Sequence, residues 1–113
     1  MIITLQWLKN RGACKWQLRL FKRRYGESVK VTKVECLAVA NMFDFDWLAS
    51  HSLSPKAWCI YNRACYRCSN HLAKKLNGKD YLKSLNLYRK GIALAFWKAG
   101  KRQKKARIYD PEV

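Results

Sequence analysis

Four side chains that could bind a metal or act as nucleophiles lie within 13 residues of one another. They are Cys59, Cys65, Cys68 and His71, in the pattern C-x5-C-x2-C-x2-H. Zinc accepts thiolate and imidazole ligands, and finger-like sites take them in pairs from two elements. At about 100° per helical residue, Cys59 and His71 point away from the face that holds the other two cysteines. We therefore expect buried, unreactive cysteines and no cofactor, with zinc as the alternative.

Catalytic chemistry is not indicated elsewhere in the sequence. A reactive thiol needs a base or a cation beside it, and nothing places either histidine, His51 or His71, next to a cysteine. The carboxylates suit structural roles: turns and caps for Glu27, Asp44, Asp46 and Asp80, and a capping box for Glu35. The sequence has no glycine-rich phosphate loop. We therefore expect a protein that is not an enzyme.

Capping signals predict the helices that must position these side chains. In the first half, helices start at Thr4, Ala13, the Thr32–Glu35 capping box and Asp44. The first two end at Gly12 and Gly26, and the third is predicted to run through Ala40. The second of these has one apolar face, made of Cys14, Leu18, Phe21 and Tyr25. Ser28–Thr32 alternates polar and apolar residues, which predicts a connector or an edge strand.

Two long helices are predicted in the second half. Ser54–Pro55 is a helix start, and this helix runs to Leu76 before Asn77–Gly78. Asp80 caps the last helix, over about residues 81–99. The predicted fold is all-α: one helical domain of five or six helices over residues 1–99, with room for one short extended segment. Residues 100–113 are expected to be a basic, flexible tail.

The longest predicted helix carries what we call the first basic stripe. Its members are Lys56, Arg63, Arg67, Asn70 and Lys74, which lie within about 40° of one another at about 100° per residue. The stripe is roughly 27 Å long at about 1.5 Å per residue, enough to follow several phosphates. The alternative is a solvated outer face, but such a face usually mixes Glu with Lys, and this helix has no acidic residue.

The last helix carries a second basic stripe. Its members are Lys83, Lys90, Trp97 and Lys101, interleaved with Leu87 and Leu94. The opposite face is the expected core: Tyr81, Leu85, Tyr88, Ile92, Ala95 and Ala99. The stripe has two interpretations. Either the helix is central and buried on both sides while its lysines reach outward, or the stripe is an exposed basic and aromatic patch for nucleic acid or a protein.

The basic tail is the third cationic feature. Of the ten residues from Lys98 to Arg107, six are basic and none is acidic. We expect a phosphate-binding arm made of Lys101, Arg102, Lys104, Lys105 and Arg107, the alternative being a nonspecific cationic run.

The charge balance points to an anionic partner. Lys and Arg number 24 against 7 Asp and Glu, a formal net charge of +17, which opposes compaction through self-repulsion. Residues 55–113 hold 15 of these basic groups and 3 of the acidic ones, so the binding surface is expected in this half. Nucleic acid is the commonest partner of such proteins.

The sequence also bears on location. No apolar run approaches the roughly 20 residues that a membrane span needs. The N-terminal Met-Ile-Ile-Thr does not have the form of a signal peptide. We expect the cytoplasm of a host cell, where the five cysteines, an odd number, would be reduced.

The order of short motifs resembles small phage and prophage helical proteins of unassigned role. The matching residues, over about residues 5–61, are Gly12-Ala-Cys14, Phe21, Tyr25-Gly26, Val29-Lys-Val31-Thr32, Phe45-Asp-Trp47-Leu48-Ala49, Leu53-Ser54-Pro55, Ala57 and Tyr61. The resemblance implies a phage or mobile-element setting, where small helical proteins bind nucleic acid or block a host defence. It implies no catalytic residues. This chain departs from the pattern by being far more basic after residue 55.

Two functional hypotheses follow. The first is a non-enzymatic protein that binds DNA or RNA phosphates through a basic helix face and the C-terminal arm. The second is a phage counter-defence inhibitor of the anti-CRISPR kind, which binds an acidic or nucleic-acid-binding host protein complex. A ribosome-associated or virion structural protein also fits the charge.

Overall fold

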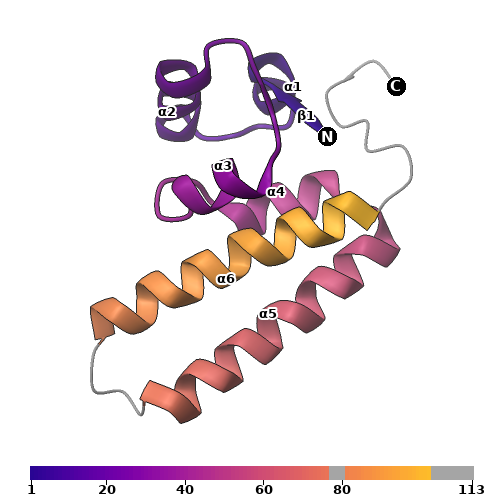
Figure 1. Cartoon of the computed structure of the whole chain (residues 1–113). Coiled ribbons are helices and arrows are strands. Elements are labelled where there is room, and N and C mark those ends of the chain that lie inside the picture. Colours follow the sequence, from indigo (N-terminus) through magenta and orange to yellow (C-terminus); the bar gives the residue numbers. More distant parts are fainter. Residues whose placement is uncertain (77–80, 103–113) are drawn as a thin grey trace.

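The computed structural model describes residues 1–76 and 81–102, which form six helices and a two-stranded sheet (Figure 1). In chain order the elements are β1 (Ile2–Thr4), α1 (Leu5–Asn10), α2 (Lys15–Tyr25), β2 (Ser28–Lys30), α3 (Lys33–Ala38), α4 (Phe45–Ser52), α5 (Pro55–Leu76) and α6 (Tyr81–Arg102). The chain is an all-α protein, as predicted. The predicted Asn77–Gly78 helix end, the Asp80 cap, and Lys104, Lys105 and Arg107 of the predicted arm lie outside the described residues.

The predicted capping residues do cap the helices. Each accepts a hydrogen bond from a backbone N–H in the first turn: Thr4 from Trp7 (3.0 Å), Thr32 from Glu35 (3.1 Å), Asp44 from Trp47 (3.0 Å) and Ser54 from Ala57 (3.2 Å). These bonds satisfy N–H groups that have no partner within the helix. The capping box at α3 is only half formed, because the Glu35 carboxylate turns away to Tyr25 and Arg24.

Three predicted helix boundaries were wrong. α2 begins at Lys15 and not at Ala13, and Cys14 is the exposed residue before it and not part of its apolar face. α3 ends at Ala38, whereas the prediction carried it to Ala40. α6 continues through Gly100 to Arg102, although the tail was predicted to begin at residue 100. Gly100 is buried, and a Cβ there would lie 2.8 Å from the Met1 side chain, so the N-terminus of the chain packs against this last turn.

The short sheet joins the N-terminus to the segment after α2. β1 and β2 are antiparallel, with Ile2 opposite Lys30 and Ile3 opposite Val29. The extended segment at Ser28 was predicted, but its partner β1 was not. Ile3 is 4% exposed and packs with Leu5, Trp7, Leu8 and Phe21 in an N-terminal core cluster.

A second and larger core cluster surrounds α6. Its most buried members are Ala49 of α4, Tyr61 of α5, and Ala93, Phe96 and Ala99 of α6, each fully covered. Figure 1 shows α6 lying between α5 on one side and α3 and α4 on the other. Ala93 and Phe96, which the expected core face did not include, are buried because α6 has neighbours on two sides.

Candidate functional site

The first basic stripe is an exposed outer face of α5. Lys56, Arg63, Arg67, Asn70 and Lys74 are all exposed. Ala57, Tyr61 and Leu72, on the other side of the same helix, are buried against the rest of the molecule. The helix therefore has the polarity that its sequence predicts, with the cations turned to solvent.

The second basic stripe has features of both interpretations of the sequence, since its cations are exposed and part of its apolar surface is covered. Lys83, Lys90 and Lys101 are exposed, as is the adjoining Arg102. Leu87 is 40% exposed, whereas Leu94 and Trp97 are half-buried. The Lys101 ammonium lies 5.0 Å from the centre of the Trp97 ring, within the range of a cation–π contact. The stripe is thus a basic surface with a partly covered aromatic ring in it.

The packing of α5 against α6 turns both stripes to one side of the helix pair. Gly91 of α6 meets Cys68 of α5, so these two residues mark the line of contact. At about 100° per residue, the centre of the first stripe is about 130° from Cys68. The centre of the second stripe is about 95° from Gly91, and the rotation has the same direction when each helix is viewed along its own N-to-C axis. The two helices run antiparallel (Figure 1). Rotations in the same direction from the line of contact therefore turn both stripes to the same side of the helix pair. We call this combined surface the basic face.

No acidic side chain offsets the charge of the basic face from within its own helices. Pro55–Leu76 and Tyr81–Arg102 contain no Asp or Glu. Within the described residues, Arg63, Arg67 and Lys74 form no ion pair, and the ion pair of Arg24 with Glu35 (2.8 Å) lies in the N-terminal part of the molecule. Charges held close together without counter-ions repel one another, and an anion bound across them relieves that repulsion.

Asp46 of α4 is a carboxylate that does reach α5, but on the buried side. It accepts a hydrogen bond from the Tyr61 hydroxyl. Burial and, to a lesser extent, this bond raise the pKa of Tyr61 far above its ordinary value, so the phenol stays neutral. Asp46 therefore anchors α4 on the buried side of α5, away from the exposed first basic stripe.

The cysteines are less uniformly buried than predicted. Cys36 is buried, Cys65 and Cys68 are partly buried, and Cys14 and Cys59 are exposed, which corrects the expectation for these two. Burial raises the pKa of Cys65 to about 11 and also raises that of Cys68, so both thiols are protonated at neutral pH and poor nucleophiles. Across residues 1–76 and 81–102, no three or more His, Cys, Asp or Glu side chains gather as a metal site would need.

The sequence reasoning missed an exposed aromatic residue beside the basic face. Tyr66 is 70% exposed on α5, three residues after Arg63 and four before Asn70, the spacings at which helical side chains are neighbours. Arg89 of α6 is a further exposed cation that neither stripe included. The i,i+3 and i,i+4 spacing around Tyr66 was a usable signal, but its ring could equally have been core.

The described helices also bear on a membrane role. None of them combines the length and the apolar character that crossing a bilayer requires.

Comparison of the chain with protein-family models, with curated proteins and with solved structures gave no match. The likeness to small phage proteins, and what it implies, therefore stays a prediction.

Proposed function

We propose that the chain is a non-enzymatic nucleic-acid-binding protein, encoded by a phage or mobile element and acting in the cytoplasm of its host. The observation that carries the proposal is the basic face itself. It is made by two acid-free helices whose cationic stripes point to the same side. A surface that is merely solvated does not need its cations gathered on one side, whereas a surface that binds a polyanion does.

The basic face has the dimensions of a backbone-binding surface. It is roughly 27 Å long, and packed helices lie about 8–10 Å apart. At about 3.4 Å per nucleotide along one strand, it covers about eight nucleotides. Lys and Arg contacts to phosphates position a protein without reading sequence. We therefore expect binding with little dependence on base sequence.

The aromatic side chains at the basic face favour binding to single-stranded nucleic acid, whose bases are unpaired. Tyr66 lies at the edge of the basic face, and the partly open Trp97 ring lies within it. Base–aromatic stacking is sequence-tolerant and contributes about 1–3 kcal/mol per base. A single strand, whose bases are free to stack, is thus expected to bind at least as well as a duplex of the same length.

A salt titration tests the proposal. Fluorescence anisotropy with labelled 20-nucleotide single-stranded DNA, single-stranded RNA and duplex DNA would be measured from low to physiological salt. The seven cations in the two stripes predict slopes of log K against log salt of about −5 for single strands and about −6 for duplex DNA, if all are engaged.

The same titration can overturn the proposal. Absence of binding to all three probes at low salt would contradict it. Co-purification of one acidic host protein complex with the unbound protein would then favour the counter-defence inhibitor instead.

A further inference from the structure

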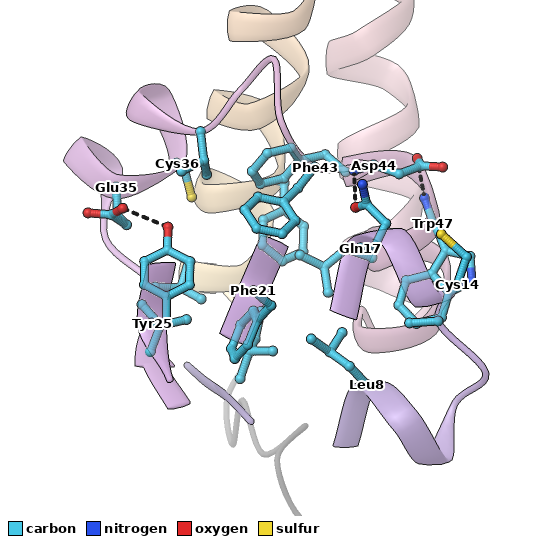
Figure 2. Close-up of a pocket in the computed structure, with 18 of the residues that line it drawn as sticks. Leu8, Cys14, Gln17, Phe21, Tyr25, Glu35, Cys36, Phe43, Asp44 and Trp47 are labelled. Carbon is cyan, nitrogen blue, oxygen red and sulfur yellow. Dashed lines mark hydrogen bonds between the residues drawn. The ribbon is translucent and has the colours of Figure 1, made fainter. Parts of the chain in front are cut away.

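A cavity is lined by residues of both core clusters of the molecule. It has a volume of about 260 Å³ and is bounded by α2, the β1–β2 sheet, α3, the segment before α4 and α4 itself (Figure 2). Proteins this small usually pack with few voids larger than a water molecule. A dry apolar cavity of about 150 Å³ is already enough to bind benzene, so this one has room for two fused rings.

Aromatic rings make up much of the cavity wall. Figure 2 shows Phe21, Tyr25 and Phe43 around the open space, with Trp47 at its edge. The rings already pair with one another: Phe21 lies edge-on to Tyr25, with centroids 5.2 Å apart, and edge-on to Phe43 at 6.5 Å. A flat aromatic guest would extend this network of edge-to-face contacts.

The polar groups at the cavity wall already have partners within the protein. Gln17 accepts a hydrogen bond from the Asp44 backbone N–H (3.0 Å) and donates one to the Met42 carbonyl (3.1 Å). Glu35 accepts from the Tyr25 hydroxyl (2.6 Å). No buried side-chain nitrogen or oxygen in the described parts of the chain lacks a hydrogen bond. A charged or strongly polar guest would find few groups on this wall to replace its lost water.

The cavity has an identifiable mouth. Among its lining residues, Gly12, Cys14 and Asp44 are exposed, and the others are buried or half-buried. A guest can therefore enter between the start of α2 and the start of α4. Cys36, by contrast, lines the inner wall and is 3% exposed.

From this geometry we infer that the cavity is a binding site for a small, neutral aromatic molecule of one or two rings. The site is separate from the basic face, and the inference does not depend on nucleic-acid binding. A bound guest would fill the space between the two core clusters and join the N-terminal elements more firmly to the helices around α6.

Naphthalene and indole are suitable probes. Added to the intact protein, each is expected to raise the melting temperature in a saturable way, because a ligand that binds only the folded state stabilises it. Each should also shift the NMR signals of methyl groups on Ile3, Leu8, Val29, Val39 and Leu48. The variant Cys36→Leu places extra carbon in the cavity and should weaken binding about tenfold or more. The matched variant Cys65→Leu makes the same chemical change at a partly buried site on α5 that does not line the cavity, and should leave binding unchanged.

Two results would overturn the inference. One is the absence of any saturable effect of either probe on the wild-type protein. The other is a shift that Cys36→Leu and Cys65→Leu leave equally intact, since the probe would then bind elsewhere. If Cys36→Leu fails to fold, Val39→Leu serves the same purpose, because Val39 also lines the cavity.

Discussion

At the scale of single residues, Gly91 sets how closely α5 and α6 approach. A Cβ at this position would overlap the Sγ atom of Cys68 and lie 3.5 Å from its Cβ. The contact lies at the centre of the helix pair, so it also sets the rotation of each helix and hence the side to which its basic stripe points.

Replacing Gly91 therefore tests the helix packing. Gly91→Ala is expected to destabilise the protein by about 1–3 kcal/mol through overpacking, even though alanine favours a helix. Adding Cys68→Ala should restore most of the loss. Urea unfolding of the two single variants and the double variant measures the coupling. Gly100→Ala is the control and should cost less, because the atom that its Cβ would crowd is the flexible end of Met1, and the Leu53 side chain lies at an ordinary contact distance. Additive effects of Gly91→Ala and Cys68→Ala would contradict this contact.

A second residue-scale feature links α2 to α3. The Glu35 carboxylate accepts hydrogen bonds from Tyr25 and Arg24, which lower the pKa of Glu35 below its ordinary 4.5. Burial, and then the bond to Glu35, raise the pKa of Tyr25 to about 12. The carboxylate is thus stabilised in its charged form, and the phenol in its neutral form.

This arrangement predicts a pH dependence of stability. The contribution of Glu35 is fully present above pH 4.5 and is lost as the pH falls through its lower folded-state pKa. Glu35→Gln should therefore cost up to about 1 kcal/mol at neutral pH, since the pair is partly exposed, and progressively less under acid conditions. Urea unfolding from about pH 3 to about pH 7, a range that covers ordinary carboxyl pKa values, measures how the free energy of unfolding of the variant differs from that of the wild type. Glu27→Gln makes the same charge change on an exposed residue, and a similar pH profile for both variants would count against the prediction.

At the scale of elements, α4 is tied in place at its first residues. Asp44 caps the helix through Trp47, and its own backbone N–H donates to Gln17 of α2. Two residues later, Asp46 accepts a hydrogen bond from the Tyr61 hydroxyl of α5. α4 therefore connects the N-terminal elements to the long helices through its N-terminus.

Removing the cap should loosen that connection. Asp44→Ala is expected to lower the free energy of unfolding by about 1 kcal/mol, as for other N-caps, while Asp44→Asn keeps the acceptor and should cost much less. Thermal unfolding measures both. Equal losses in the two variants would mean that the carboxylate charge matters more than the cap.

Local signals predicted most of these elements, and long-range pairing accounts for the rest. Thr4, Asp44 and Ser54–Pro55 act on neighbours three residues away or fewer, so their caps could be read directly. β1 could not, because Ile3 pairs with Val29, 26 residues on. The Glu35 carboxylate accepts a hydrogen bond from Tyr25 and so does not complete the capping box. Helix α6 continues past Gly100, where Met1 packs against it. Each of these outcomes depends on a residue distant in sequence.

At the scale of the whole molecule, the charge is sorted by part. Residues 55–113 hold 15 of the 24 basic residues. The composition of the basic face could be predicted, since the period of a helix fixes which side chains share a side. That its two stripes point the same way could not, because it depends on the Gly91–Cys68 contact. The Tyr66 ring and the cavity were missed, since periodicity does not say which apolar or aromatic groups stay uncovered.

The C-terminal arm can be tested by truncation after Arg102. The deletion removes three basic and two acidic residues and changes the net charge only from +17 to +16. If Lys104, Lys105 and Arg107 contact phosphates, the salt slope for duplex DNA should become shallower by up to about 3. Anisotropy titrations measure the slope, with the melting temperature as the control for folding. An unchanged slope would leave the basic face as the whole binding surface.

The central claim is that the basic face, and not net charge alone, binds nucleic acid. The most direct measurement compares the nucleic-acid binding of two triple charge-reversal variants. The first carries Arg63→Glu, Arg67→Glu and Lys74→Glu on the basic face. The second carries Arg19→Glu, Arg23→Glu and Lys33→Glu in the N-terminal part of the chain. All six residues are exposed, and each triple changes the net charge from +17 to +11. The first triple should lose binding to the 20-nucleotide probes, or bind duplex DNA with a salt slope shallower by about 3, while the second keeps the wild-type slope. Equal losses in both triples, or normal binding by the first, would contradict the claim.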